Sequence, residues 1–301
     1  MTKPVPGYLL ALAAAALWST LGPITRILLD THHLSSLNIA FLRGALSSAT
    51  FLIGLSIFRR DLIKPPPGTL WQLVVLGVIG VGAFYIALAQ GVKLAGIALL
   101  SVLVNVAPIC VTLVSAIFFH EPLTPKKLIV LALAVVGGAL VVKIYDPGAL
   151  RLSWPGILAG LAAYTGYVFF ASFSKSLSGK CDPRTMLTYA FGIAAFVLLP
   201  LQGGEGLAAA LQPAAWPFII ALIAGPTLGA WASFSLSLRH IPVSNSTIVV
   251  SMDAVFSNIW AFIFFRELLE SPQLFGGALI LLAVILLQLE LPQRAKQPEM
   301  A

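Results

Sequence analysis

Apolar residues form long uninterrupted stretches along this chain, separated by short segments that carry charges or clusters of Pro and Gly. A helix needs about 20 apolar residues to cross a bilayer, so 301 residues with short connections can hold roughly ten such helices. The pattern therefore predicts an all-α integral membrane protein with ten transmembrane helices. The predicted spans are residues 7–29, 36–58, 70–90, 97–119, 128–142, 156–177, 185–201, 215–238, 243–265 and 273–289.

The first apolar stretch follows Lys3 and contains a run of alanines, a pattern that a secretory signal peptide also shows. The stretch continues through Trp18 to Leu29, however, which makes it long enough to cross a bilayer. We therefore expect an uncleaved first helix.

The composition fits the same class, because 59% of the residues are hydrophobic and only 10% are charged, against roughly a quarter charged in soluble domains. The formal charge of +7 is spread through short loops and forms no patch, which argues against a nucleic-acid partner. Alternating the ten spans places twelve Lys and Arg residues on one face and five on the other. This bias predicts a multi-pass membrane protein with both termini in the cytoplasm.

The chain contains an internal repeat with an offset of 146 residues. In this register the segment 117–121, Ile-Phe-Phe-His-Glu, lies over 263–267, Ile-Phe-Phe-Arg-Glu. Chance similarity between two apolar segments is the alternative, which the shared Phe-Phe-x-Glu disfavours. We expect two five-helix repeats, residues 1–146 and 147–301. Since five is an odd number, the second repeat is inverted in the bilayer, an arrangement typical of transporters.

These features resemble the ten-helix EamA-type members of the drug/metabolite transporter superfamily. The likeness rests on the two repeats, on Ala107-Pro108 in the fourth span, and on Phe119-His120-Glu121-Pro122-Leu123-Thr124 at its end. A weaker copy, Phe265-Arg266-Glu267-Leu268-Leu269, closes the ninth span, and Phe41-Leu42-Arg43 lies early in the second. The chain is most similar to bacterial amino-acid exporters of the YddG type, which implies a carrier of the plasma membrane, the bacterial inner membrane, with a central substrate cavity and alternating access. The second repeat departs from the pattern with Asp253-Ala254 in place of Ala107-Pro108.

Two charged residues lie inside predicted spans, where an unpaired charge costs from about 3 to more than 10 kcal/mol. They are Asp253, near the middle of the ninth span, and Arg43, about seven residues into the second. In one interpretation Arg43 binds a substrate carboxylate, while Asp253 takes the ammonium group or a coupling proton. The alternative is a structural role, in which Arg43 and Asp253 pair with each other or with backbone carbonyls. Arg43 could also extend its long side chain to the membrane interface. Depth favours function for Asp253, and nearness to a helix end favours a structural role for Arg43.

Aromatic and amide side chains in the middle of the spans are the other candidates for substrate binding: Trp18, Tyr85, Asn105, Tyr164, Tyr167, Trp231 and Asn258. Buried Trp and Tyr need partners for their polar tips, which a hydrated cavity would supply. Ordinary packing is the alternative. Tyr85 falls on Trp231 in the repeat register, and an offset of 149 places Trp18 on Tyr167, which strengthens these four. An apolar cavity with a few polar groups suits amphipathic substrates, including amino acids with aromatic or aliphatic side chains.

Helix-breaking residues stand at corresponding places in the third and eighth spans, as expected for bending or discontinuous transporter helices. The candidate hinges are Gly80, Gly82, Pro108, Gly225 and Pro226. The same small residues could instead serve close helix packing without motion.

Glu121 and Glu267 lie at helix ends with access to water. We expect each to cap or orient the connection to the next helix, outside the substrate site. Cys110 and Cys181 are far apart in the predicted topology and lack metal-ligand spacing, so no metal site is predicted.

The sequence predicts a secondary carrier, and the resemblance implies export. An intramembrane enzyme is the competing class, but the chain contains neither His-Glu-x-x-His nor Gly-x-Ser-x-Gly, and it has no nucleotide-binding loop. No cofactor is expected. The expected partners are a small-molecule substrate and the lipid bilayer, and the protein could act as a monomer. Cationic drugs or other metabolites are alternative cargoes. Nucleotide sugars and sugar phosphates rank below them, because phosphorylated cargo should require several Lys or Arg in the cavity.

Overall fold

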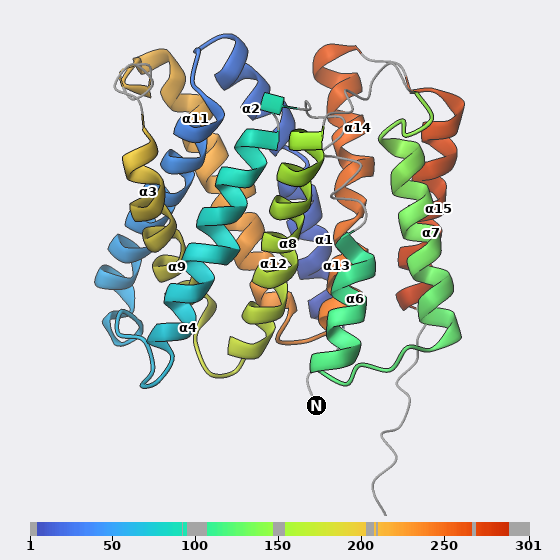
Figure 1. Cartoon of the computed structure of the whole chain (residues 1–301), viewed down its shortest axis with the longest axis horizontal. Coiled ribbons are helices and arrows are strands. Elements are labelled where there is room, and N and C mark those ends of the chain that lie inside the picture. The colour runs from blue at the N-terminus through green and yellow to red at the C-terminus, as the bar shows by residue number, and fades with distance from the viewer. Residues whose placement is uncertain are drawn as a thin grey trace, which may run out of the picture.

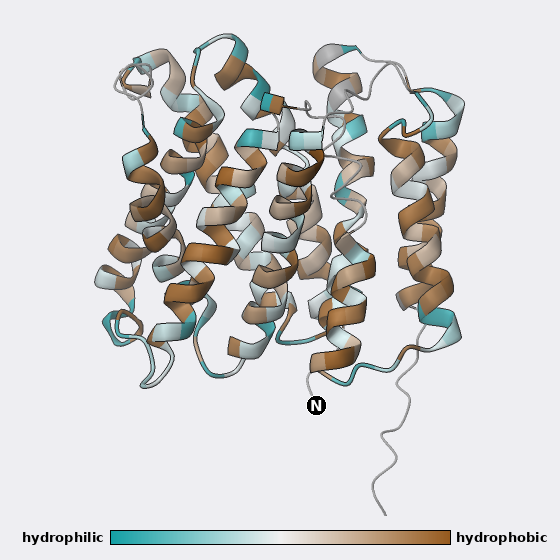
Figure 2. Cartoon of the chain, in the orientation of Figure 1, coloured by the Kyte–Doolittle hydropathy of each residue, from teal (hydrophilic) through white to brown (hydrophobic). Residues whose placement is uncertain are grey.

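The computed structural model describes residues 5–91, 93–94, 107–146, 154–202, 208, 210–266 and 269–288. Secondary structure in these residues is helical, apart from one isolated bridge between Ser178 and Cys181. Helices occupy all ten predicted spans, and seven of the described helices are long and apolar enough to cross a membrane. They stand side by side (Figure 1), with apolar residues along their middle and hydrophilic residues at both ends (Figure 2). The predicted all-α membrane fold is confirmed.

The first five spans contain both continuous and interrupted helices. The first is broken after Trp18, and the third changes from an α-helix to a π-helix and back. The described elements are α1 (Val5–Trp18), α2 (Leu21–Asp30), α3 (Ser36–Phe58), the short η1 (Arg60–Leu62), α4 (Leu70–Val75), the π-helical η2 (Leu76–Ala83), α6 (Ala107–Phe118) and α7 (Pro125–Val141).

The last five spans are interrupted in the eighth and ninth helices. The eighth also passes through a π-helix, and the ninth is broken at Ser251. The described elements are α8 (Trp154–Leu177), α9 (Pro183–Leu198), η3 (Leu199–Leu201), η4 (Pro213–Ala215), α11 (Trp216–Leu222), the π-helical η5 (Ile223–Gly229), α12 (Ala230–Ser237), α13 (Val243–Val250), α14 (Met252–Phe265) and α15 (Ser271–Gln288).

Local sequence signals start several of these helices. At the start of α3 the Ser35 hydroxyl accepts a hydrogen bond from the Asn38 backbone N–H, and the Asn38 side-chain oxygen accepts one from the Ser35 backbone N–H, which completes a capping box. Thr124 and Asp182 cap α7 and α9 by accepting from the backbone N–H groups of Lys127 and Arg184, and each is followed by Pro at the first helical position. These caps fix where the chain re-enters the apolar layer.

The packing of the two repeats follows a two-fold pattern. The second span packs against the seventh (α3 on α9), the fourth against the ninth (α6 on α13), and the fifth against the tenth (α7 on α15). The first span packs on the eighth (α1 on α12), and its counterpart, the sixth, packs on the third (α8 on η2). Figure 1 shows α7 and α15 adjacent at the right-hand side. Each repeat therefore completes the packing of the other, as a pseudo-two-fold axis requires.

Backbone irregularities also recur at the 146-residue offset. The π-helices η2 and η5 occupy equivalent places in their repeats, and His120 and Arg266 both adopt a left-handed conformation, with φ of 54° and 56°. Such a φ is uncommon for residues other than Gly. The repeated Phe-Phe pair is thus followed in both repeats by a residue in the left-handed conformation.

Close helix contacts depend on glycine in the pair α7 and α15. A Cβ atom on Gly137 would lie 2.6 Å from the Gly276 carbonyl oxygen, and one on Gly276 would lie 2.5 Å from the Gly137 oxygen. The two backbones approach directly, which is a common use of small residues in membrane helices.

Candidate functional site

Five of the predicted aromatic site residues gather in one cluster at the centre of the bundle. Tyr85, Tyr164 and Trp231 are buried in it, and Trp18 and Tyr167 pack against it. Trp18 has its ring centroid 5.2 Å from that of Trp231 and 6.4 Å from that of Tyr167, in edge-to-face arrangements. The structure thus brings together residues of the first, third, sixth and eighth spans.

Two polar tips in this cluster have no hydrogen-bond partner among the described residues. They are the Tyr85 hydroxyl, on a side chain 1% exposed, and the Trp231 Nε1–H, on a side chain 2% exposed. An unsatisfied buried group costs about 1–3 kcal/mol. Buried groups of this kind occur where a water or a ligand completes the site.

Arg43 lies beside this aromatic cluster and is only 5% exposed. Its Nε donates to the Thr227 hydroxyl at 3.1 Å, and its guanidinium carbon lies 4.7 Å from the centre of the Tyr85 ring. The alternative in which Arg43 extends to the membrane interface is therefore wrong. In the described part of the chain no carboxylate pairs with Arg43.

The π-helix η5 positions the Thr227 hydroxyl for this contact. Thr227 donates to the Leu222 carbonyl, five residues earlier, at 2.8 Å, and it accepts from Arg43. The interruption comes at the predicted helix breakers, Gly225 and Pro226, where Pro cannot supply the regular backbone bond. Single π turns are frequent at functional sites. The sequence signal for a helix break was thus readable, but its consequence for Thr227 and Arg43 was not.

Asp253 lies in the first turn of α14, directly after the break at Ser251. The positive end of a helix dipole favours a carboxylate in that position. Among the described residues no ion pair joins Asp253 to Arg43.

Of the two predicted amides, the structure describes Asn258. Asn258 lies on α14 and is half-buried. The same helix is fixed to the break in the first span, because Trp260 Nε1 donates to the Ser19 hydroxyl at 3.0 Å. Asn105 lies outside the described residues.

The predicted hinge residues lie in irregular helix, with one exception. Gly80 and Gly82 belong to η2, and Gly225 and Pro226 belong to η5, whereas Pro108 is the second residue of α6 as described. Packing accounts for Gly80, since a Cβ there would lie 3.3 Å from Phe170 Cα. It does not account for Gly225, where the nearest atom would be 3.9 Å away.

Glu121 makes contacts that the sequence analysis missed. Its buried carboxylate accepts a bond from the Val243 backbone N–H at 3.0 Å and another from the Ser244 hydroxyl, and it pairs with Lys127 Nζ at 3.1 Å. Lys127 belongs to the next helix, α7, as expected, but the helix that Glu121 caps is α13 of the other repeat. Pro242 precedes the first residue of α13 and provides no side-chain cap. The missing cap is the sequence signal that could have indicated a capping group from elsewhere in the chain. Glu267 lies outside the described residues.

A pocket of ≈ 310 Å³ opens beside Glu121, between the ends of α6, α8 and α12. Lys175 lines it and donates to the carbonyls of Leu238 and Ile241 at 2.6 and 3.1 Å, which satisfies the end of α12. Arg239 also lines the pocket. We call this the basic end of the bundle, the end that also carries Arg59 and Arg184.

No group of His, Cys, Asp and Glu that could hold a metal occurs in the part of the chain that the structure describes. Cys110 and Cys181 are both free thiols.

Comparison with known proteins gives a family and a fold. The model of the EamA-like transporter family matches twice, over residues 5–143 and 154–289. A solved crystal structure shares the fold, with a TM-score of 0.79 and 17% identity over 93% of this chain and 95% of that one.

Relatives in other organisms are described as transporters. An uncharacterized transporter of Archaeoglobus fulgidus is 28% identical over 251 residues, covering 83% of this chain and 86% of the relative. A probable terminal-alkyne amino-acid exporter of Streptantibioticus cattleyicolor is 24% identical over 271 residues, covering 90% and 89%. Both likenesses extend over most of each chain.

Proposed function

Because the chain belongs to the EamA-like transporter family, we propose that this membrane transporter exports small amphipathic amino acids, including aromatic ones. Cargo would enter at the basic end, which we place in the cytoplasm from the bias of loop charge. It would bind at the aromatic cluster and leave on the other side by alternating access. The protein would work in the plasma membrane with both termini inside, and a monomer would suffice.

The observation that carries this proposal is the buried guanidinium of Arg43. A buried cation without a carboxylate partner is costly, and intramembrane charges of this kind mark substrate paths. Thr227 takes one side of the guanidinium and Tyr85 covers its face. The Nη groups would then bind a substrate carboxylate in the bidentate way that suits arginine.

Asp253 would take the opposite charge of the same substrate, its ammonium group, or a coupling proton. Its place at a helix break supports this role, since transporters bind cargo at discontinuous helices. The aromatic rings beside Arg43 would hold an apolar side chain.

Cationic drugs are the second candidate cargo, because Asp253 and the aromatic rings by themselves suit an organic cation. Phosphorylated cargo is disfavoured, since one buried arginine offers too few donors for a phosphate group.

Flux into liposomes that contain the purified protein tests the proposal. We expect saturable tryptophan flux, and roughly 10- to 100-fold weaker apparent affinity in Arg43→Gln, from the loss of a charge-assisted bond. Flux of tryptamine, which lacks the carboxylate, should change little in the same variant. Arg26→Gln is the matched control, because Arg26 is exposed and paired with Asp30 at 3.7 Å.

Asp253→Asn should slow flux or abolish its dependence on a pH gradient. Full flux with unchanged pH dependence would remove Asp253 from the mechanism. Absence of saturable flux for every amino acid would refute the proposed cargo, and flux of organic cations alone would establish the second candidate.

A further inference from the structure

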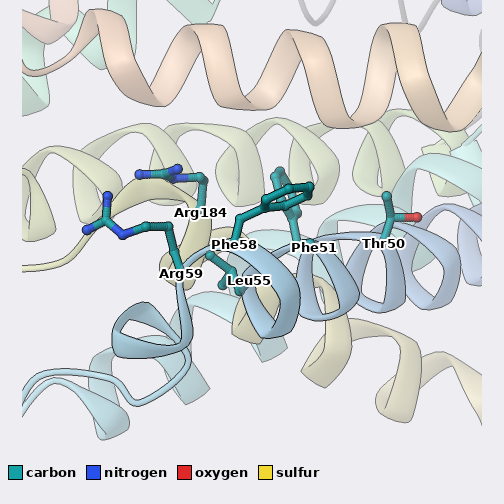
Figure 3. Close-up of a pocket in the computed structure, with 7 residues that line it drawn as sticks. Thr50, Phe51, Leu55, Phe58, Arg59 and Arg184 are labelled. Atoms are coloured by element: carbon teal, nitrogen blue, oxygen red, sulfur yellow. The ribbon is translucent and has the colours of Figure 1, made fainter.

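An apolar groove runs along the outer face of α3 towards the basic end. It has a volume of ≈ 190 Å³ and is lined by one stripe of α3 and by the first turn of α9 (Figure 3). The lining residues are Thr50, Phe51, Gly54, Leu55, Phe58, Arg59 and Arg184. The groove shares one residue with the hydrophobic cluster that contains the aromatic site residues, Phe51, which packs against that cluster.

Gly54 keeps this groove open. A Cβ atom placed on Gly54 would meet no atom within 4 Å, so close helix packing does not explain a glycine here. Glycine inside a helix costs roughly 0.5–1 kcal/mol relative to alanine. The absent side chain leaves a hollow in the middle of an apolar stripe, where an acyl chain of the surrounding bilayer fits.

Two arginines mark the end of the groove. Arg59 follows the last residue of α3, and Arg184 lies in the first turn of α9, so both stand at the level where the apolar layer ends. Figure 3 shows both side chains at the same end, beyond Phe58. Their exposed fractions are 51% and 47%, which leaves them open to a headgroup.

Neighbouring carboxylates orient these guanidiniums without covering them. Arg59 donates to Asp61 through Nε and Nη2 at 3.1 and 2.9 Å, and Arg184 donates to Asp182 through the same two nitrogens at 3.0 and 3.4 Å. A guanidinium has five N–H donors, so each arginine keeps about three for another ligand. The local charge remains positive, since Arg60, Lys64 and Lys180 adjoin these two pairs in sequence.

We propose that this groove binds one anionic glycerophospholipid, with an acyl chain along the α3 stripe and its phosphate between Arg59 and Arg184. Basic pockets between transmembrane helices on the cytoplasmic side bind anionic headgroups. Such a lipid would bridge α3 and α9, the second span of one repeat and the second span of the other.

Native mass spectrometry of the full chain, released from nanodiscs of mixed phosphatidylglycerol and phosphatidylcholine, tests the site. We expect retained phosphatidylglycerol at one molecule per chain. Each of Arg59→Gln and Arg184→Gln should weaken this preference about fivefold, and both together about 25-fold, as contacts worth ~1 kcal/mol each require. Gly54→Leu should displace the acyl chain and reduce retention of both lipids.

Two control variants distinguish a site from general surface effects. Arg60→Gln removes a neighbouring charge that does not line the groove, and Gly22→Leu fills open space on another helix, α2. Arg60→Gln should weaken lipid retention much less than Arg59→Gln, and Gly22→Leu should leave it unchanged. Equal retention of the two lipids by the wild-type protein, or equal effects of Arg60→Gln and Arg59→Gln, would overturn the proposal. So would displacement of the lipid by millimolar inorganic phosphate, because a chain-anchored lipid would resist it.

Discussion

Replacing Glu121 with alanine should destabilise the protein strongly. The carboxylate is buried, with a side chain 9% exposed, and it holds the Val243 N–H, the Ser244 hydroxyl and Lys127 at once. Its removal leaves the Lys127 ammonium, 7% exposed, without a counter-charge. Breaking a buried ion pair on one side costs about 3–5 kcal/mol. We expect a loss of that size in the free energy of unfolding.

The assay is unfolding by sodium dodecyl sulfate in mixed micelles, followed by helical circular dichroism. Glu121→Gln keeps the shape and one acceptor but loses the charge, so it should cost less, about 1–3 kcal/mol. Adding Lys127→Met to Glu121→Ala removes the unpaired cation and should recover part of the loss, a coupling of roughly 0.5–3 kcal/mol.

A loss below about 1 kcal/mol in Glu121→Ala would refute this reasoning, because it would mean that water reaches the pair and screens it as at a surface. Full additivity of the Glu121 and Lys127 changes would refute the pairing itself.

Three further predictions concern single contacts. Trp231→Phe should cost about 1–2 kcal/mol of the free energy of unfolding, the packing of the removed part of the indole, because the deleted N–H has no partner in the described residues; a loss well above that, measured by the same unfolding assay, would reveal a partner. Gly137→Leu should cost at least about 1–3 kcal/mol, since its Cβ would meet the Gly276 carbonyl oxygen, and an unchanged unfolding curve would show that α7 and α15 can separate freely. Hydrogen bonds from Lys143 and then Tyr145 lower the pKa of the Glu270 carboxyl. Their small contribution to the free energy of unfolding should therefore be fully present above pH 4.5, the ordinary pKa, and be lost as the pH falls through the lower pKa of the folded state. A titration of the free energy of unfolding against pH should lack this step in Glu270→Gln.

The number and order of the membrane-spanning helices were predictable, because hydropathy, loop charge and the 146-residue repeat each indicate them independently. Helix breakers in the third and eighth spans were also readable, although Gly and Pro do not specify a π-helix over a simple kink. The sequence predicted that Arg43 and Asp253 are exceptional, since charges are costly at membrane depth.

The partners of these charges were not predictable. Lipid and protein interior are both apolar, so the pattern of a span does not say which side faces inwards. Nothing in the sequence marks Thr227 as a functional residue, because its hydroxyl contacts Arg43 only in the π-helical backbone of η5. The bond between Glu121 and Val243 joins residues more than a hundred positions apart, and no local pattern encodes it.

The exchange of packing between repeats has a consequence for synthesis. The first span packs on the eighth and the third on the sixth, so the first repeat has no complete partner surface until the second is made. At about 5–20 residues per second, the second repeat takes roughly 8–30 s to emerge. During that interval Arg43 lacks its hydrogen-bond partner Thr227, and the helices of the first repeat lie in the bilayer with polar groups that have no protein contacts. Attachment of a chaperone or the insertion machinery to the first repeat would be most valuable in this interval.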